Sequence, residues 1–311
     1  MDKKKITIVT GTGGILGTGH IQRMLCLAER LNREKSFSAS ILLKQNVYPL
    51  PDKFNSLLTD TIPADTGLII RDMRDSSIEE IRSLKKSAPV LAIDDSGEGA
   101  NYADHKISLL PVPSGGLRND KPDISKFLYG YNFTRGINLL KDRNHLKRDI
   151  DVAVYAGYDP SAELISQIKK SIPENTSSLL LSGGRAARLT GDISPENINY
   201  AEVLSRAKLV ITHFGLTMFE AHACGCSIAA LNPTSYHSTL TDMISVEFNI
   251  IYSSEYRLLS PDVLRNVIDK ELNNYNGQYI SINVILKKIN ICTENFIDYI
   301  REITINYSNN S

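Results

Sequence analysis

The first half of the chain alternates short apolar runs with amphipathic stretches. A β-branched run at residues 5–10 (KITIVT) stops at a glycine-rich loop, and apolar side chains then recur every three or four positions, as on one face of a helix. Further strands are predicted at residues 39–43, 67–71 and 89–94. The capping-box spacing of Ser76 and Glu79 predicts a helix that continues to residue 86. Strands that alternate with helices in this way predict βαβ units and a parallel sheet.

The second half repeats this rhythm. Its predicted strands cover residues 151–157, 178–184, 209–212, 227–231 and 250–252. Its predicted helices follow Pro160, begin at about Thr217 and cover residues 239–248. Between the halves lie a Pro-, Gly- and Ser-rich stretch and a mixed-charge stretch that ends near residue 149. We therefore predict two α/β domains, residues 1–148 and 149–311. The apolar spacing of residues 281–299 predicts a final helix, which can pack back on the first domain.

Composition narrows the class of protein. With 311 residues, a hydrophobic fraction of 42% and a charged fraction of 23%, the chain is expected to be globular and long enough for two cores. Lys plus Arg and Asp plus Glu are both 35, so no overall field favours a nucleic acid as a partner. The apolar run at residues 6–9 is too short for a secretory signal, and residues 221–241 are too polar for stable membrane insertion. We expect a cytoplasmic protein with reduced cysteines, as a monomer or weak oligomer.

The first candidate site is the glycine-rich loop at residues 11–19, between a predicted strand and a predicted helix. Such a turn frees backbone N–H groups next to the positive end of a helix dipole, where an anion or a ligand can approach closely. The alternative is that the glycines only permit a tight turn. His20 begins the helix at the edge of the sheet where open α/β folds bind ligands, and there the dipole favours the neutral imidazole that a general base needs. A structural role for this histidine is the alternative interpretation.

The second candidate site is the strand, turn and helix at residues 209–225. Thr217 and Glu220 have the spacing of a capping box, which would explain them without a ligand. The same turn is also a typical anion site, and the carboxylate of Glu220 is well placed to accept hydrogen bonds from the ribose hydroxyls of a nucleotide. One anion-binding turn in each domain suggests a ligand that bridges them.

These residues resemble a known family. Residues 17–31 (GTGHIQRMLCLAERL) resemble the opening of the nucleotide-sugar hydrolase of pseudaminic acid synthesis (PseG) and of its spore-coat polysaccharide relatives (SpsG). The resemblance continues, in the family's order, through residues 90–95, 128–130, 156–160 and 215–220, and so covers most of the chain. The lipid-linked N-acetylglucosaminyltransferase of peptidoglycan synthesis (MurG) is a more distant relative. The fold that this resemblance implies is GT-B: two Rossmann-like α/β domains whose parallel sheets face a central cleft.

The resemblance also implies functions for particular residues. The family hydrolyses a nucleotide sugar without a metal, and His20 would help to activate water. The substrate-binding residues implied are Gly13, Gly14, Gly17, Gly19, Asp94, Asp95, Tyr236 and His237. The nucleotide-binding residues implied, for UDP or a similar nucleotide, are Gly157, Gly183, His213, Phe214, Gly215, Leu216, Thr217 and Glu220. This sequence departs from the family at residues 213, 214 and 216, and where relatives have an Asn-Gln pair it has residues 236 and 237.

Two other functions stay open at this point. His20 would equally well take a proton from an acceptor hydroxyl, and residues 44–63 are somewhat apolar, so a MurG-like glycosyltransferase is the second interpretation. The third is a nucleotide-sugar-binding protein without activity. We expect no cofactor and no catalytic metal, because the histidines lack ligand spacing and the glycine loop departs from the dinucleotide fingerprint.

Overall fold

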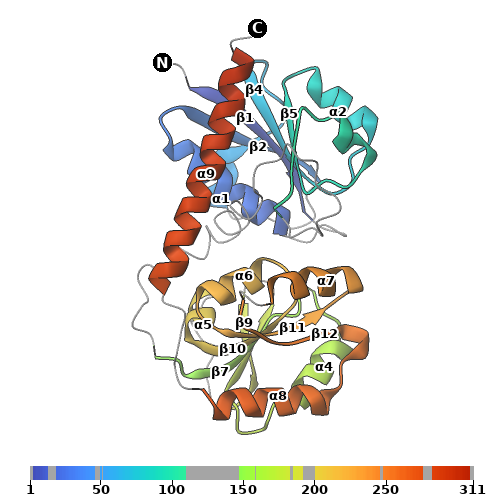
Figure 1. Ribbon diagram of the computed structural model, residues 1–311, viewed down its shortest axis with the longest axis vertical. Helices are drawn as coiled ribbons and strands as arrows, with labels where there is room; N and C mark the ends of the chain where they lie inside the picture. Colours follow the sequence, from blue (N-terminus) through green and yellow to red (C-terminus); the bar gives the residue numbers. More distant parts are fainter. Residues whose placement is uncertain are drawn as a thin grey trace. The chain divides into compact units, whose positions relative to one another are not determined.

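The chain divides into two compact units. The computed structural model describes residues 3–12, 19–45, 50, 52–109, 147–157, 159–182, 185–191, 200–245, 248–275 and 282–308. Unit 1 comprises residues 1–134 and 290–311, and unit 2 comprises residues 135–289. The boundary expected at residue 148 stays a prediction, since residues 110–146 lie outside the described part. Within that part, each unit contains its own sheet of six strands (Figure 1).

All strand pairings described for unit 1 are parallel, in the order β3-β2-β1-β4-β5-β6. The strands are β1 (Lys4–Gly11), β2 (Phe37–Gln45), β3 (Leu58–Thr59), β4 (Thr66–Asp72), β5 (Val90–Ile93) and β6 (His105–Ile107). The helices are α1 (Gly19–Arg33) and α2 (Ile78–Lys85), with the 3₁₀ helices η2 (Asp52–Leu57) and η3 (Glu98–Tyr102). Six consecutive residues of β1 are buried, as expected for a central parallel strand covered on both faces.

The start of α2 differs by one residue from the prediction. The N-cap is Ser77, whose hydroxyl accepts a hydrogen bond from the backbone N–H of Glu80. Ser76 is buried, and its own N–H donates to the carboxylate of Asp95. The expected capping box of Ser76 and Glu79 is therefore wrong, because the residue before the cap is engaged with a different loop.

Unit 2 has the strand order β12-β11-β10-β7-β8-β9. The strands are β7 (Ile150–Val154), β8 (Ser178–Ser182), β9 (Arg185–Thr190), β10 (Ala207–Thr212), β11 (Ser227–Asn232) and β12 (Ile250–Glu255). The helices are α4 (Ala162–Ser171), α5 (Tyr200–Arg206), α6 (Leu216–Ala223), α7 (Ser235–Ile244) and α8 (Pro261–Asn273), with the 3₁₀ helix η4 (Tyr256–Leu258). Only the edge strand β9 runs antiparallel among the pairings described. The parallel sheet predicted for this half is confirmed, and β9 is an addition to it.

The final helix α9 (Ile282–Ser308) contributes apolar side chains to the core of unit 1 (Figure 1). Phe296, Ile297, Ile300 and Ile303 are buried in one cluster with residues of β1, β2 and α1. Full burial of such side chains stabilises a fold by about 1.5 to 3 kcal/mol each, so this helix is an integral part of unit 1. An ion pair between Arg30 and Glu294, with a 2.6 Å separation of nitrogen and oxygen, links α1 to α9 at the surface.

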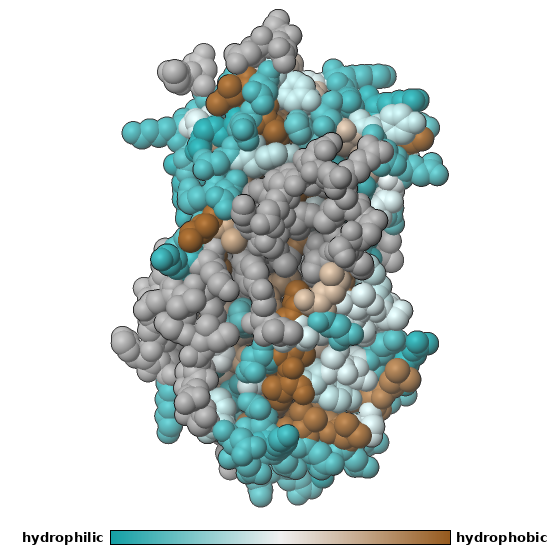
Figure 2. Space-filling view, viewed as in Figure 1, coloured by the Kyte–Doolittle hydropathy of each residue, from teal (hydrophilic) through white to brown (hydrophobic). Residues whose placement is uncertain are grey.

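The visible surfaces of the two units differ in character. Figure 2 shows mainly hydrophilic side chains on the visible face of unit 1 and several apolar patches on that of unit 2. Large exposed apolar side chains of the described residues occur in both units: Tyr102, Ile291 and Ile305 in unit 1, and Tyr236, Met243, Leu258 and Val263 in unit 2. Within the described residues, no helix combines the length and the apolar character that crossing a bilayer requires.

Candidate functional site

In unit 1, charged and polar side chains gather where three strands of the sheet end. β1, β4 and β5 are mutually parallel neighbours, so their carboxyl ends share one edge of the sheet. α1 begins at this edge, with His20 as its second residue and Arg23 one turn later. Residues three apart lie on the same side of a helix, and here both side chains are directed toward Asp72, the last residue of β4.

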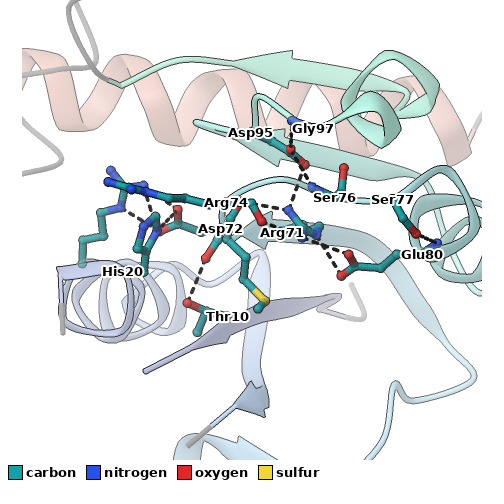
Figure 3. A network of polar contacts seen from close by, with 12 residues as sticks. Thr10, His20, Arg71, Asp72, Arg74, Ser76, Ser77, Glu80, Asp95 and Gly97 are labelled. Atoms are coloured by element: carbon teal, nitrogen blue, oxygen red, sulfur yellow. Dashed lines mark hydrogen bonds and ion pairs between the residues drawn. The ribbon is translucent and has the colours of Figure 1, made fainter. Parts of the chain in front are cut away.

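His20 is paired with a buried carboxylate (Figure 3). Its Nδ1 lies 2.8 Å from Oδ1 of Asp72, and the His20 side chain retains 12% of its exposed surface while that of Asp72 retains none. Burial alone would raise the pKa of Asp72, but the positive charges of Arg23 and His20, with hydrogen bonds from both, lower it to about 2. An ionised carboxylate only accepts hydrogen bonds, so Nδ1 of His20 is the donor. Nε2 of His20 is then the atom that can exchange a proton with a ligand or water.

Arg23 connects this pair to a third strand end. Its Nε donates to Oδ2 of Asp72 at 2.7 Å, its Nη2 lies 2.5 Å from Oδ1 of Asp72, and its Nη1 lies 2.7 Å from Oδ2 of Asp94. Asp94 follows β5 with a φ of 50°, a left-handed conformation that side chains rarely adopt. Its Oδ1 accepts hydrogen bonds from the Ser108 hydroxyl and from the Leu109 backbone N–H. The structure thus brings the predicted residues His20 and Asp94 into one network through Arg23.

Asp95, by contrast, points into a separate network (Figure 3). It is 2% exposed, and its oxygens accept hydrogen bonds from Arg71 and from the backbone N–H groups of Ser76 and Gly97. Its predicted contact with a substrate stays a prediction, and the interactions described for its carboxylate are all within the protein.

The glycines of the first loop are only partly described. Gly19 is the first residue of α1, and a Cβ placed on it would meet no atom within 4 Å among those described. Gly13, Gly14 and Gly17 lie outside the described residues, as does Gly183 of unit 2.

In unit 2, the turn between β10 and α6 is built around His213. Gly215 is the N-cap of α6, with φ 157° and ψ −170°, a region that is open essentially only to glycine. Gly157, just after β7, has a φ of 114°. A Cβ on Gly157 would lie 3.9 Å from Cε1 of His213, and a Cβ on Gly215 would lie 3.8 Å from its Nε2. The two predicted glycines therefore lie beside the same imidazole.

Neutral aromatic groups surround His213. The Tyr155 ring stacks on it, with ring centroids 5.8 Å apart and an angle of 26° between the planes, and the Tyr256 hydroxyl lies 3.4 Å from its Nδ1. Burial, and to a smaller degree the nearby His237, lower the pKa of His213 to about 4. Burial also raises the pKa of Tyr256, so both groups are neutral at pH 7.

Thr217 and Glu220 are joined by a tyrosine instead of by a capping box. α6 begins at Leu216 with Gly215 as its cap, so Thr217 lies inside the helix and the capping-box alternative is wrong. The Tyr200 hydroxyl, at the start of α5, lies 2.6 Å from Oγ1 of Thr217 and 2.8 Å from Oε2 of Glu220. Burial and the charge of Glu220 raise the pKa of Tyr200 well above its usual value, which keeps this hydroxyl protonated. Glu220 itself is 2% exposed.

The remaining predicted residues of unit 2 fall into two groups. Phe214 is buried against Phe219, and its backbone N–H donates to the side chain of Asn232, so its ring belongs to the core. Tyr236 and His237 lie in the first turn of α7, which is capped by the Thr234 hydroxyl. Their rings are in edge contact, and His237 is close enough to influence the pKa of His213. These two residues thus belong to the edge of the unit 2 sheet that carries His213.

Sequence reasoning missed several of the residues that build these sites. Asp72 follows the strand predicted at residues 67–71 and is the last residue of β4, and this position at a carboxyl end was the available signal. Tyr155 lies within the strand predicted at residues 151–157, whereas Tyr200 and Tyr256 have no local pattern that identifies them. Among the described residues, no group of three or more His, Cys, Asp or Glu side chains is placed to hold a metal ion.

Comparison with known proteins defines the fold. No protein-family model matches the chain, and no curated protein is similar enough in sequence to match. Solved structures are similar over nearly the whole length. A candidate UDP-N-acetylglucosamine 2-epimerase of Listeria monocytogenes matches with a TM-score of 0.56 and 11% identity, covering 96% of both chains.

Two other solved structures are similar to a comparable degree. MurG of Acinetobacter baumannii matches with a TM-score of 0.54 and 13% identity over 96% of this chain and 99% of its own. A UGT transferase of Siraitia grosvenorii, solved with UDP, matches with a TM-score of 0.56 and 11% identity over 95% of this chain and 99% of its own. At such identities the likeness concerns the fold. The chain has the GT-B fold, with two Rossmann-like units, each built on a mostly parallel six-stranded sheet within the described residues.

Proposed function

We propose that this protein is a cytoplasmic enzyme that hydrolyses a nucleotide sugar into a nucleoside diphosphate and a free sugar. The observation that carries the proposal is the pairing of His20 with the buried, ionised Asp72. His20, Arg23 and Asp94 all stand in sequence blocks that resemble the PseG and SpsG hydrolases, and in the structure they belong to one network with Asp72. A network assembled from the residues of that resemblance supports the same chemistry.

The proposed reaction uses His20 as a general base. Nε2 accepts a proton from a water molecule while the water oxygen attacks the anomeric carbon of the sugar. The bond between that carbon and the diphosphate oxygen breaks, and the nucleoside diphosphate leaves with the bonding electrons. Asp72 holds the imidazole through Nδ1 and stabilises the imidazolium that forms, and Arg23 fixes the position of Asp72. Asp72 and Arg23 are positioning residues in this scheme.

Unit 2 is proposed to hold the nucleotide. The N-terminus of α6 offers backbone N–H groups and the positive end of a helix dipole for a phosphate. Gly157 and Gly215 leave the edge of the His213 ring without a neighbouring Cβ, which allows a ligand to approach this turn. Glu220 is proposed to recognise the ribose, with Tyr200 and Thr217 fixing its orientation.

A MurG-like glycosyltransferase is the second candidate. It is favoured by the similarity to MurG of Acinetobacter baumannii and to the Siraitia grosvenorii transferase, which covers at least 95% of this chain. The same histidine would then take its proton from an acceptor hydroxyl. A binding protein without activity is the least favoured, because it would have no use for a buried carboxylate that orients an imidazole.

The deciding experiment incubates the purified chain with UDP-, GDP- and CDP-sugars, with and without lipid or glycan acceptors. Release of free sugar and nucleoside diphosphate in water alone supports hydrolysis. Strict dependence on an acceptor supports glycosyl transfer, and conversion to an isomeric nucleotide sugar supports epimerisation. Calorimetric binding of a nucleotide sugar without turnover under any condition supports the binding protein. Activity that survives EDTA treatment would agree with the expectation of a metal-independent reaction.

A further inference from the structure

A second network of charged side chains lies beside the first at the same strand ends (Figure 3). At its centre is Arg71, the residue before Asp72, with 1% of its surface exposed. Its Nε and Nη2 donate to the two oxygens of Glu80 at 2.9 and 3.0 Å, and its Nη1 donates to Asp95 at 2.8 Å. The other N–H groups of Nη1 and Nη2 donate to the backbone carbonyls of Met73 and Arg74. All five donors of the guanidinium group are thereby used.

Asp95 extends this network to two loops. Its Oδ2 accepts from Arg71, and its Oδ1 accepts from the backbone N–H groups of Ser76, at 3.0 Å, and Gly97, at 2.9 Å. Ser76 belongs to the loop after β4, and Gly97 to the loop after β5. The two loops are in direct contact, since a Cβ on Gly97 would lie only 2.3 Å from the Ser76 carbonyl oxygen. Asp95 thus connects the backbones that follow both strands.

The two networks are built from consecutive residues. Arg71 and Asp72 end β4, and Asp94 and Asp95 follow β5. Successive side chains of a strand point to opposite faces of the sheet, so Asp72 is directed to α1 and Arg71 to α2. Arg23 connects the two strand ends on one face, through Asp72 and Asp94, and Arg71 connects them on the other, through Asp95.

We propose that Arg71, held by Glu80 and Asp95, is a positioning residue that fixes the carboxylate of Asp72 against His20. The proposal rests on the proposed function of His20 as the base. Both loops contain a residue in a left-handed conformation, Asp75 with a φ of 48° and Asp94 with a φ of 50°. Such backbone persists only where the surroundings determine it, and the hydrogen bonds of this network supply that constraint. Buried ion pairs contribute little net stability compared with apolar packing, which favours a role in geometry over one in stability alone.

The test compares two neutralising substitutions on the same helix. Glu80→Gln removes one of the two carboxylate charges that hold Arg71, whereas Lys85→Gln removes a charge of α2 that pairs with Asp104. Asp95→Asn is expected to disturb the same network more, because Asp95 also accepts hydrogen bonds from the backbones of both loops. The readouts are the melting temperature, kcat and KM with the active nucleotide sugar, and the tautomer of the His20 imidazole from ¹⁵N NMR, assigned with His20→Asn.

We expect Glu80→Gln and Asp95→Asn to lower kcat by about tenfold with KM within about twofold, and to convert the His20 signal from the Nδ1–H tautomer to a mixture. Lys85→Gln should leave kcat, KM and the His20 tautomer as in the wild type. Equal melting losses in all variants with an unchanged tautomer and kcat would overturn the proposal. The NMR readout needs no substrate, so it decides the positioning role even if the protein hydrolyses nothing. If Asp95→Asn does not fold, Glu80→Gln carries the test.

Discussion

The two units hold a histidine in opposite kinds of surroundings. In unit 1, His20 contacts the ionised carboxylate of Asp72, which Arg23 also holds. In unit 2, His213 lies among the neutral rings of Tyr155 and Tyr256, and its pKa is lowered to about 4. A carboxylate stabilises an imidazolium and so prepares a histidine for proton transfer, whereas burial among neutral groups keeps an imidazole uncharged.

The backbone of the two sites differs in the same way. Unit 1 positions its side chains by ion pairs between strand ends, and left-handed backbone there is found at the aspartates Asp75 and Asp94. Unit 2 positions its turn by glycines, with Gly157 and Gly215 beside His213. Under the proposed function, the charged residues of unit 1 position the general base, and the glycine-containing turn of unit 2 binds the nucleotide.

The largest effect is expected at His20. Replacing it with Asn removes the proposed base, so turnover should fall on the order of a hundredfold or more while the affinity for nucleotide stays within about twofold. His105→Asn is the control, because this half-buried histidine of unit 1 contacts Tyr299 and Tyr307 on α9 instead of Asp72. Steady-state kinetics and calorimetry measure the two quantities. Wild-type turnover in His20→Asn would remove His20 from the mechanism.

The next effect concerns the stability of unit 1 in acid. Asp72 has a pKa of about 2 in the folded chain and an ordinary value of 3.8. Because the folded value is the lower one, its ionisation stabilises the fold fully above pH 4, and this contribution is lost as the pH falls from 4 to 2. The contribution is about 2 kcal/mol. The difference between the free energies of unfolding of the wild type and of Asp72→Asn, measured with urea, should therefore shrink by about that amount between pH 5 and pH 2. A constant difference across this range would mean that folding does not change the pKa of Asp72.

The sequence was sufficient for much of the fold, for reasons seen in particular elements. Residues 5–10 and 209–212 are apolar runs that end in glycine-containing turns, and such runs predict buried parallel strands. Three elements of unit 2 were missed, and one of them, α8, begins at a proline and has the length and apolar spacing of an ordinary helix. The other two are β9 and α5. β9 has the polar sequence RAARLT, and α5 has only seven residues. Neither is long or periodic enough to predict, because tertiary pairing determines them.

The candidate sites were predictable only where a residue stands in a local motif. His20 begins a helix that follows a glycine-rich loop, and Gly215 lies in the turn before α6, so both stand beside a local signal. Asp72 acts through contacts with residues 49 and 52 positions away, so nothing near it in the sequence identifies its partners. The same holds for Tyr200, whose hydroxyl contacts Glu220. The capping-box interpretation of Thr217 was wrong because Gly215 adopts the cap conformation one residue before the helix.

A smaller effect is expected from Gly215→Ala. The conformation of Gly215 strains any other residue by about 1 to 3 kcal/mol, although the nearest described atoms to the new Cβ would be 3.8 Å away. The turn should therefore shift, and nucleotide affinity should fall about tenfold with a modest loss of melting temperature. Gly67→Ala in β4 is the control, because a Cβ there meets only an ordinary contact at 3.6 Å. Equal effects of both substitutions would show that the turn of unit 2 has no special part in binding.

The smallest effect is expected from pH on the nucleotide site. Since the pKa of His213 is about 4, only a few per cent of this imidazole is charged at pH 5.5. The affinity for a nucleotide sugar should thus vary by no more than about twofold between pH 5.5 and pH 8. A histidine with an ordinary pKa would gain its charge over this range and bind the diphosphate more tightly in acid.

The measurement is calorimetry with His20→Asn, which is expected to bind the nucleotide sugar without consuming it. A nucleotide sugar is preferable to a free nucleoside diphosphate, whose terminal phosphate itself titrates near pH 6. His213→Asn in the same background is the control, since Asn keeps a polar group but cannot titrate. An affinity that rises tenfold toward pH 5.5, and loses that rise in His213→Asn, would show that His213 is charged at the site. The two histidines would then no longer differ in their ability to carry a charge. The charged imidazole of unit 2 would contribute directly to diphosphate binding.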